Sequence, residues 1–511
     1  MHLTRVTRNA LLVGVFFALD KGVGFIRQVI IARQFGLSDA LDAFNVANNV
    51  PDLLFALISG GALAMAFIPV LTESLTQRGE RATWQLFSHV ANLAFLVTGI
   101  LGILVGIFAQ PLVTWELGVA PGFGHEQQQL VVDLMRLNLI ATIIFSLSGL
   151  VMAALQAHQH FLLPAMAPLF YNLGQIFGAV VLAPEQGVSL GGITLPAFGL
   201  GVHGLVYGVI LGAVLHLGIQ VPGLIRYGFQ WQAGLGLHQP DVRKVLRLMG
   251  PRLLTVLCIQ LIFIVRDNLA SRLVTGAVTA LTYGWMIFQV PETLIGTALG
   301  TALLPALSEQ IARSQGDAFH ESIQRAMQVL VALTLPLTVI LGLGMRPFLE
   351  VVFGFGVEGT DLLWRVSQAY LLGLLGQCLV EVMVRAFYAR QNAWVPLLGA
   401  GVTLGFYVLT GTQLYRWLGA PGISLADALS FSAEALLLAL LLARTLKRGF
   451  RIWPVFARAG LAAGISGGVI WLGQSGIPWG HSLLMAGGLM GLGGMLSLPW
   501  IWQEIRLLIR L

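Results

Sequence analysis

Long apolar runs follow one another along nearly the whole chain of 511 residues, separated by short polar segments. The hydrocarbon core of a bilayer is about 30 Å thick, so a helix that crosses it needs about 20 predominantly apolar residues. By that criterion the pattern predicts about fourteen membrane-spanning helices. Their approximate cores are residues 11–35, 46–71, 87–115, 131–157, 161–183, 196–222, 247–274, 278–307, 322–345, 363–388, 394–416, 423–443, 455–473 and 481–502.

The composition indicates an all-α polytopic membrane protein. The chain is 57% hydrophobic and 10% charged, with a mean hydropathy of +0.83, and a soluble protein of this composition would expose a large apolar surface. Both cysteines, Cys258 and Cys378, fall in predicted spans, so the sequence offers neither a disulfide framework nor a zinc cluster. We expect no metal site and no cofactor.

Two motifs occur twice along the chain. The segment 60–75 returns as 296–311, and the segment 154–160 returns as 386–392. Each second copy lies six predicted helices after the first, and an even number preserves the direction of the chain. The repeats therefore predict two parallel six-helix halves, related by an axis along the membrane normal, with substrate bound between them.

This duplication suggests a division of the chain into four parts. We expect an N-lobe at residues 1–225, a cytoplasmic linker at 226–246, a C-lobe at 247–446 and two further helices at 447–511.

Lysine and arginine residues are concentrated in alternate loops. Cytoplasmic loops hold the excess of these residues in membrane proteins, and with both termini in the cytoplasm the outer loops keep mainly Arg346 and Arg416. We therefore predict that both termini are cytoplasmic. The sequence pI near 9.6 then reflects contact with anionic membrane lipids, and no nucleic acid partner is expected.

Charged residues inside the first predicted span point to a functional cavity, because charge is costly in a bilayer and usually faces the interior of the bundle. This span contains Asp20, Lys21, Arg27 and Gln28. At about 100° per residue, Asp20, Gly24 and Arg27 share one stripe of the helix, with Lys21 and Gln28 beside it. The pattern predicts a polar face on an otherwise apolar helix.

The seventh predicted span, which leads the second half, is also cationic, with Arg266, Asp267 and Arg272. Guanidinium groups pair bidentately with phosphate oxygens, so cations from both leading helices suit an anionic substrate. The structural alternative is that Lys21 and Arg272 reach the membrane interface by snorkelling and that Asp267 neutralises a neighbouring helix.

Two acids in the twelfth predicted span, Asp427 and Glu434, could bind a coupling cation or a proton, but we favour a role as hydrogen-bond partners in helix packing. The sequence contains no Walker loop, nucleophile elbow or HExxH motif. Neither ATP-driven transport nor a familiar hydrolase chemistry is therefore indicated.

Several segments, taken in their order and spacing, resemble one known family, the MurJ (MviN) lipid II flippases, of which this chain looks like a divergent member. They cover most of the first eleven predicted spans. The segments are Gly24–Arg27, Phe35–Gly36, Asp42–Phe44, Pro51–Leu54, Gly60–Leu63, Ala66–Leu71, Ala120–Phe123, Phe161–Asn172, Gly296–Ser308 and Phe387–Gln391.

The resemblance implies the MOP exporter superfamily fold, in which two six-helix lobes form a central cavity and two C-terminal helices form a groove for a polyprenyl tail. It implies a transporter rather than an enzyme. The implied cargo is lipid II, the undecaprenyl-pyrophosphate-linked peptidoglycan precursor, moved from the inner to the outer leaflet of the bacterial cytoplasmic (inner) membrane by alternating access. Contacts with membrane lipids and with the peptidoglycan synthesis machinery are further expectations.

The resemblance also assigns roles to residues. Arg27 matches the family's cavity arginine, Lys21 falls where another cation is usual, and Asp42 matches an aspartate on the outward side. On this basis we expect substrate contacts from Lys21, Arg27, Gln28, Asn172, Arg266 and Arg272, and a part in conformational change for Gly24, Asp42, Gly60 and Gly61.

The chain departs from the family at cavity positions. In the second predicted helix, Asn49 and Phe55 stand where the flippases usually have a lysine and an arginine, and Gln28 replaces an acid in the first. The eleventh helix has no acid, so the sodium site of some relatives cannot be carried over. An Asp-Arg pair and a nearby Glu of the eighth helix are replaced by Trp285, Met286 and Gln289.

Three interpretations of these departures stay open. The cavity cations have moved to Arg266 and Arg272, or the chain moves another polyprenyl-linked glycan, or it is a non-transporting scaffold of an envelope-synthesis complex. Each lost charge-assisted contact would be worth about 1.5–3 kcal/mol, which is too much to ignore. The scaffold interpretation predicts that Arg27 and Arg266 tolerate alanine, whereas the flippase interpretation predicts loss of function.

Overall fold

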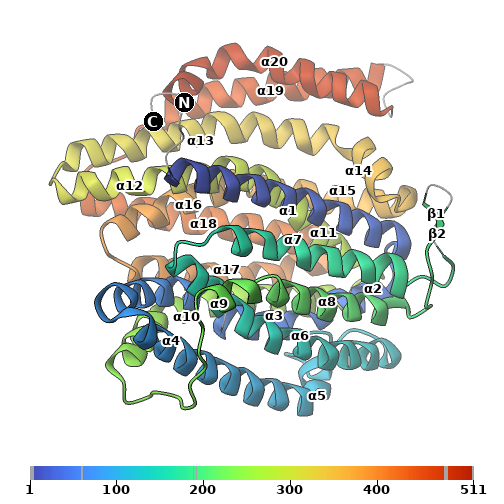
Figure 1. The fold of residues 1–511 in the computed structure, drawn as a ribbon. Helices are drawn as coiled ribbons and strands as arrows, with labels where there is room; N and C mark the ends of the chain where they lie inside the picture. Colours follow the sequence, from blue (N-terminus) through green and yellow to red (C-terminus); the bar gives the residue numbers. More distant parts are fainter. Residues whose placement is uncertain (1–4, 59–60, 188, 191–192, 477–481, 509–511) are drawn as a thin grey trace. The chain divides into compact units, whose positions relative to one another are not determined.

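The computed structural model describes residues 5–58, 61–187, 189–190, 193–476 and 482–508, and these residues are almost entirely helical (Figure 1). A short antiparallel hairpin lies in the loop before α8. Its two strands, β1 (Ser189–Leu190) and β2 (Ile193–Thr194), have two residues each. The helices are α1 (Arg5–Phe35), α2 (Asp39–Ala47), α3 (Asn49–Ile58), α4 (Gly61–Ile107), α5 (Ala109–Thr114), α6 (His125–Ala157), α7 (Leu162–Phe177), the π-helix η1 (Gly178–Leu182), α8 (Gly201–Gly218), α9 (Val221–Arg226), α10 (Pro240–Ala270), α11 (Ala277–Glu292), the π-helix η2 (Thr293–Thr297), α12 (Ala298–Ala312), α13 (Gly316–Gly344), α14 (Arg346–Phe353), α15 (Gly356–Leu372), α16 (Leu374–Ala389), α17 (Trp394–Leu418), α18 (Ala420–Leu446), α19 (Trp453–Gly476) and α20 (Leu483–Leu508).

The predicted all-α, multi-pass fold is confirmed, with a difference in the count of spans. Within the described ranges, 11 helices are long and apolar enough to cross a membrane, or 12 if the bent pair α15 and α16 forms one span. The expected first span corresponds to α1, which is not among these helices; in residues 13–35 of α1, whose side chains the structure describes, the charged residues Asp20, Lys21 and Arg27 interrupt the apolar stretch. The expected second span is divided among α2, α3 and the first part of α4.

Internal contacts divide the chain into two compact units, residues 1–268 and 269–511. The sequence placed a linker at residues 226–246, and this range holds the end of α9, a loop and the start of α10. Since α10 continues without interruption to Ala270, the division between the units falls near its C-terminal end. The lobe boundaries at 225, 246 and 446 stay a prediction.

The loop that follows α6 and the loop that follows α16 have the same backbone conformation. Gln159 and Gln391 both have φ of 58°, a conformation uncommon for residues other than glycine. The N–H of Gln159 donates to the carbonyl of the residue three positions earlier at 2.9 Å, and the N–H of Gln391 does the same at 2.9 Å. In each loop the following N–H donates to the carbonyl five positions before it, at 2.9 Å in the first loop and 3.0 Å in the second. The same Schellman-type helix ending thus occurs at both copies of the repeated motif.

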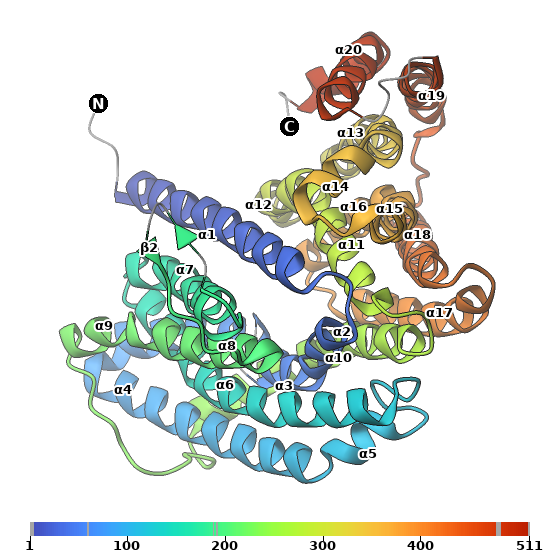
Figure 2. The same ribbon diagram turned by 90° about the vertical axis from the view of Figure 1, so that its right-hand side faces the viewer.

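In the first unit, α7 lies between α1 and α8 and approaches α8 through glycines (Figure 2). A Cβ atom built on Gly174 of α7 would lie 2.4 Å from the Cα of Gly212, and one on Gly178, the first residue of η1, would lie 2.6 Å from the Cα of Gly208. Small residues let membrane helices approach closely in this way. The contact with α8 holds α7 in place, and α7 in turn presents its other side to α1.

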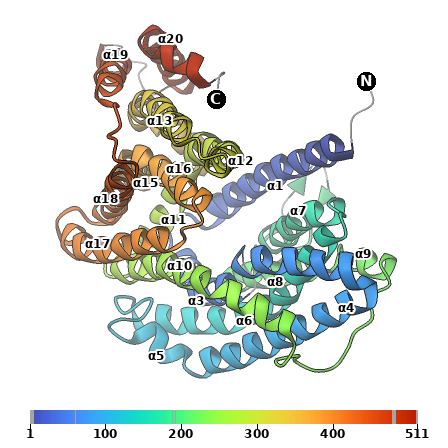
Figure 3. The same cartoon turned by 90° about the vertical axis from the view of Figure 1, so that its left-hand side faces the viewer.

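In the second unit, α13 packs against α16 on one side and against α19 and α20 on another (Figure 3). An ion pair between Arg458 of α19 and the buried carboxylate of Glu504 on α20 joins the last two helices. A groove for a lipid tail at residues 447–511 stays a prediction. The apolar contacts among α13, α19 and α20 involve Val331, Ala332, Val455, Ala459, Ala462 and Ile501.

Candidate substrate-binding site

The polar face of α1 meets a single side chain of α7. Arg27 Nη1 donates a hydrogen bond of 2.8 Å to Asn172 Oδ1, and Asn172 Nδ2 donates one of 2.7 Å to Asp20 Oδ1. Asn172 is only 6% exposed, whereas Arg27 is half-buried. One buried amide therefore connects an acid and a guanidinium that stand two helical turns apart on α1.

Gly24 stands between Asp20 and Arg27 on the same stripe of α1, directly under the amide. A Cβ atom at this position would lie 3.5 Å from Asn172 Nδ2 and 3.6 Å from Asn172 Oδ1. An alanine would make ordinary van der Waals contact there, but a longer side chain would displace the amide. The stripe of Asp20, Gly24 and Arg27 predicted from helical periodicity is therefore the face that α7 contacts.

Lys21 and Gln28 flank this stripe. Lys21 is exposed, and its Nζ lies 5.2 Å from the ring centroid of Phe17, one turn earlier on α1. This is a cation–π distance. Gln28 is half-buried. The roles of both residues in substrate binding stay predictions.

Arg266 is part of a buried polar group near the end of α10. Its Nε lies 2.7 Å from Asp267 Oδ1, and its guanidinium lies 5.1 Å from the ring centroid of Phe263. Asn49 of α3 donates a 2.6 Å hydrogen bond to the other carboxylate oxygen of Asp267. Asn49 occupies a position where the family resemblance implied a lysine. The carboxylate of Asp267 is therefore contacted by an amide and by the adjacent Arg266.

Arg272 does not lie in the helix where the sequence placed it. α10 ends at Ala270, and the N–H groups of Arg272 and Leu273 bond to carbonyls three residues back, at 3.3 and 3.0 Å. Such i to i−3 bonds tighten and end a helix. The predicted span at 247–274 extended four residues further, but Arg272 is exposed in the turn that leads to α11.

The other expected conformational residues are Asp42, Gly60 and Gly61. Asp42 is 2% exposed in the first turn of α2, where the Ser38 side chain accepts the Leu41 N–H and caps the helix. Gly61 is the first residue of α4, and Gly60 lies outside the described residues.

Two of the positions where the family resemblance implied charged side chains, Phe55 and Trp285, belong to aromatic clusters. Phe55 lies 5.5 Å from Phe145, centroid to centroid, and Phe145 lies 5.0 Å from Tyr171, the neighbour of Asn172. In the second unit, Trp285 lies 5.2 Å from Phe288 and 5.6 Å from Tyr370. Aromatic contacts thus replace charge within each unit separately.

Two buried acids of the second unit, Glu434 and Glu292, accept hydrogen bonds from threonines. Thr403 on α17 donates a 2.6 Å hydrogen bond to Glu434 on α18, and Glu292 accepts hydrogen bonds from Thr293 and Thr297. Within the described residues, no group of three or more His, Cys, Asp or Glu side chains could hold a metal ion. For Glu434 this geometry is that of the packing role favoured from the sequence.

Comparison with known proteins places these features in a family. The family described as "Lipid II flippase MurJ" matches residues 31–488 of the chain. The chain belongs to the MurJ family. The lipid II flippase MurJ of Burkholderia cenocepacia is 32% identical over 445 residues, which cover 85% of this chain and 82% of that protein. A probable lipid II flippase MurJ of Vibrio cholerae is 27% identical over 511 residues, covering 96% and 94%.

Solved structures support the same assignment at the level of the fold. A MurJ lipid II flippase in an inward closed conformation has a TM-score of 0.78 at 19% identity, covering 97% of this chain and 99% of that one. An inward-facing multidrug resistance MATE transporter of the MOP superfamily has a TM-score of 0.67 at 14% identity, covering 85% and 98%. This MurJ family member therefore has a MOP transporter fold, and its family consists of transporters rather than enzymes.

Sequence reasoning found the stripe on α1 but not the partner that organises it. Asn172 entered the prediction only through a family segment, because an asparagine in an apolar helix carries no charge signal. The bond from Asn49 to Asp267 was likewise missed, since 218 positions separate the two residues. A search for single polar residues inside apolar spans would have drawn attention to both asparagines.

Proposed function

We propose that this multi-pass membrane protein is a lipid II flippase and that Arg27 of α1 contacts the pyrophosphate of the cargo. The observation that supports this role most directly is the network of Asp20, Asn172 and Arg27, because a charged residue within a membrane helix is expensive and is usually functional. Asn172 fixes the guanidinium through Nη1, and an oriented guanidinium loses less entropy when it binds phosphate oxygens.

Asp20 makes this arrangement suitable for transport rather than for permanent capture. The carboxylate of Asp20 and the guanidinium of Arg27 both bond to the amide of Asn172. The carboxylate is therefore close enough to reduce the effective positive charge of Arg27, and it does not replace Asn172 as the hydrogen-bond partner of Arg27. A flippase has to release its cargo in the outer leaflet, and a partly balanced cation holds pyrophosphate less tightly than an isolated one.

In this proposal Arg266 has a positioning role. It is 6% exposed and lies 2.7 Å from its own neighbour Asp267, so the pair carries little net charge. Removing one partner of a buried ion pair leaves an uncompensated charge and is strongly destabilising. We infer that Arg266 and Asp267 hold α10 to α3 through Asn49, and that they do not replace the missing cavity cations of the family.

We further propose the topology that the loop charges predict, with both termini in the cytoplasm and transport from the inner to the outer leaflet by alternating access. Lys21, an exposed cation one residue after Asp20, adds attraction for the anionic head group at the face of α1. Asp42 and Gly24 act in the conformational change.

A second candidate cargo is another polyprenyl-pyrophosphate glycan. The aromatic clusters around Phe55 and Trp285 favour this alternative, because they occupy positions where the family resemblance implied charged side chains. A non-transporting scaffold is disfavoured by the buried amide that orients Arg27, since a scaffold has no need of an oriented charge in its membrane helices.

Complementation separates these candidates. Bacteria depleted of their own lipid II flippase receive wild type, Arg27→Ala, Asn172→Ala or the control Arg33→Ala, with protein levels measured by blot. Arg33 is exposed in the last turn of α1, so it tests the effect of removing a cation from the same helix. Rescue by wild type and Arg33→Ala alone supports the proposal. Failure of well-expressed wild type indicates another glycan, and rescue by Arg27→Ala contradicts the role of Arg27.

A further inference from the structure

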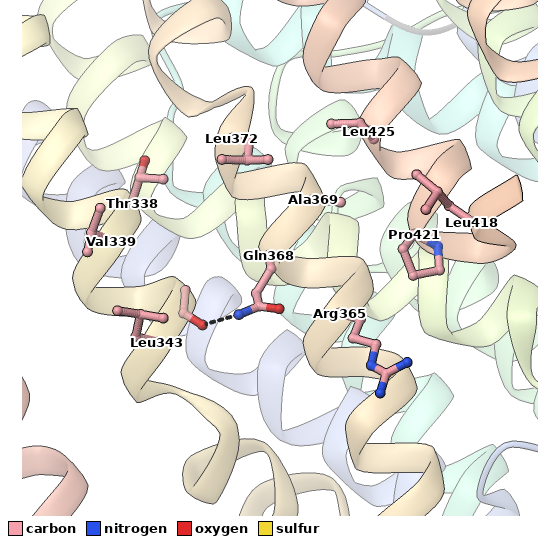
Figure 4. Close-up of a pocket in the computed structure, with 11 residues that line it drawn as sticks. Thr338, Val339, Leu343, Arg365, Gln368, Ala369, Leu372, Leu418, Pro421 and Leu425 are labelled. Atoms are coloured by element: carbon pink, nitrogen blue, oxygen red, sulfur yellow. Dashed lines mark hydrogen bonds between the residues drawn. The ribbon is translucent and has the colours of Figure 1, made fainter. Parts of the chain in front are cut away.

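A groove of about 630 Å³ in the second unit lies outside everything assigned so far (Figure 4). It runs between α13, α15 and the start of α18. This volume is in the range of sites that hold ligands. All of its lining residues belong to the unit at 269–511, so its shape does not depend on the other unit.

The walls of the groove are mostly apolar, and a hydrogen bond joins two of them. Along α15 the positions Arg365, Ala369 and Leu372 recur at helical spacing and so share one face. The amide of Gln368 is turned toward α13, where it donates a 2.8 Å hydrogen bond to the carbonyl of Gly342 (Figure 4). Gln368 therefore ties the two walls together and leaves the surface that faces the groove largely apolar.

Arg365 is the only charged residue among those that line the groove. Its side chain is exposed, and in the described part of the chain it makes no ion pair or hydrogen bond. The acid one turn earlier on α15, Asp361, is bonded at 2.7 Å to Arg346. The guanidinium of Arg365 therefore presents its positive charge at one end of the groove.

The apolar and cationic ends of the groove lie at different depths. Arg365 lies at one end, and Leu372 and Leu425 lie at the other (Figure 4). Leu372 follows Arg365 by seven positions, a rise of about 10 Å along a helix. In the topology proposed above, α15 runs from the outer surface toward the middle of the membrane, so Arg365 is the end nearer the outer head groups and Leu372 is the deeper end.

We propose that this groove binds an anionic phospholipid of the outer leaflet, with one acyl chain along α13 and α15 and the phosphate on Arg365. The apolar walls match an acyl chain, and the exposed guanidinium matches a phosphate with which it can form two parallel hydrogen bonds. The order of the two ends matches a lipid whose head lies at the interface and whose tail points to the midplane. The groove belongs to the unit at 269–511, whereas Arg27 belongs to the unit at 1–268, and this proposal does not depend on the identity of the cargo.

Two substitutions test the two halves of this site. Arg365→Gln removes the charge but keeps a polar side chain. Gly342→Leu fills the groove, because a Cβ atom at Gly342 would meet only the Cγ of Gln368, at 4.0 Å, and so leaves the helix backbone undisturbed. Arg416→Gln is the matched control, since Arg416 is an exposed arginine near the end of α17 that does not line the groove.

The probe is phosphatidylglycerol with a photoreactive diazirine at the end of one acyl chain, mixed into phosphatidylcholine nanodiscs that contain the purified full-length protein. After irradiation, labelled peptides are identified by mass spectrometry. We expect label near Thr338, Leu372 and Leu425 in wild type and in Arg416→Gln. We expect about tenfold less label in Arg365→Gln, as for a lost charge-assisted hydrogen bond, and none above background in Gly342→Leu.

Three results would overturn the proposal. The first is equal labelling of wild type and Arg365→Gln, and the second is equal labelling by a phosphatidylcholine probe. The third is displacement of the label by an equimolar polyprenyl phosphate, which would assign the groove to the tail of a polyprenyl lipid. Arg365→Lys checks the fold of the site, since it keeps the charge and should recover most of the labelling.

Discussion

At the scale of single residues, the central feature is an amide that divides its hydrogen bonds between a cation and an acid. Asn172 accepts from Arg27 and donates to Asp20, so neither a leucine nor an aspartate could replace it. Leucine would leave a half-buried guanidinium and a half-buried carboxylate without this partner, and aspartate could not donate to Asp20. A fully buried unsatisfied group costs about 1–3 kcal/mol, and the cost at these half-buried groups is smaller because water screens them.

Gly24 allows a graded test of this network. Gly24→Ala should keep transport and raise helix stability by about 0.5–1 kcal/mol, because its Cβ atom fits at 3.5 Å from Asn172 Nδ2. Gly24→Leu should push the amide away from Arg27 and reduce transport at least as much as Asn172→Ala. The measurement is rescue of flippase-depleted cells at matched protein levels, and equal rescue by both variants would rule out close packing at this position.

At the scale of structural elements, glycine contacts set how closely the helices of a unit approach. A Cβ atom at Gly212 would lie 2.6 Å from the backbone oxygen of Tyr171, whereas one at Gly218, on the same helix α8, would meet nothing within 4 Å. The contact of α7 with α8 therefore leaves no room for a methyl group at Gly212. Since α7 carries Asn172, this packing positions the site.

We expect Gly212→Ala to be destabilising by about 1–3 kcal/mol, as for overpacking of a core, and Gly218→Ala to be neutral or slightly stabilising. The midpoints of thermal unfolding in detergent compare the two variants. If α7 moves away from α1 in response, Gly212→Ala should also lose transport. Identical midpoints for both variants would show that the two helices separate easily.

The loop between α6 and α7 should make stability depend on pH. Burial, and then the positive charge of Arg226, lower the pKa of His160 from its ordinary value of 6.5. His160 therefore stays neutral in the folded protein at pH values where it binds a proton in the unfolded chain. Because the unfolded state takes up this proton below pH 6.5, stability contributed by the loop is present at higher pH and is lost as the pH falls.

This effect can be isolated by comparing His160→Gln with the control His320→Gln in the other unit. We expect the unfolding midpoint of wild type and His320→Gln to decrease more between pH 8 and pH 5 than that of His160→Gln. Parallel curves for all three proteins would show that His160 titrates as in an unfolded chain.

At the scale of the whole molecule, the sequence was most informative where a physical constraint acts on many residues together. The need of a bilayer for about 20 apolar residues per helix predicted most of the spans. The repeated motif at 154–160 and 386–392 proved to end its helix in the same way at both copies, at Gln159 and Gln391. Local details were harder to predict. The end of α10 before Arg272 depends on turn bonds, and the role of Asn172 depends on a contact between α1 and α7 that no local pattern encodes.

The proposed topology can be tested on intact cells with single introduced cysteines. Gln315 lies in the turn between α12 and α13, on the predicted cytoplasmic side. Glu185 lies in the loop after η1, on the predicted outer side. Both residues are exposed, and each is replaced by cysteine in a separate variant, Gln315→Cys and Glu185→Cys. With Cys258 and Cys378 replaced by serine, a maleimide that cannot cross membranes should label Glu185→Cys alone. Labelling of Gln315→Cys alone would reverse the topology, and with it the assignment of the phospholipid groove to the outer leaflet.

The most direct test of the account is transport by the purified protein. Liposomes containing fluorescent lipid II receive wild type, Arg27→Ala or Arg33→Ala, and an external reductant that cannot cross the bilayer bleaches the lipid that reaches the outer leaflet. We predict complete bleaching with wild type and Arg33→Ala, and a rate reduced about tenfold or more with Arg27→Ala, since charge-assisted contacts to phosphate are lost. Two results would contradict the proposed function: bleaching limited to one leaflet with correctly folded wild type, or equal rates of bleaching with wild type and Arg27→Ala.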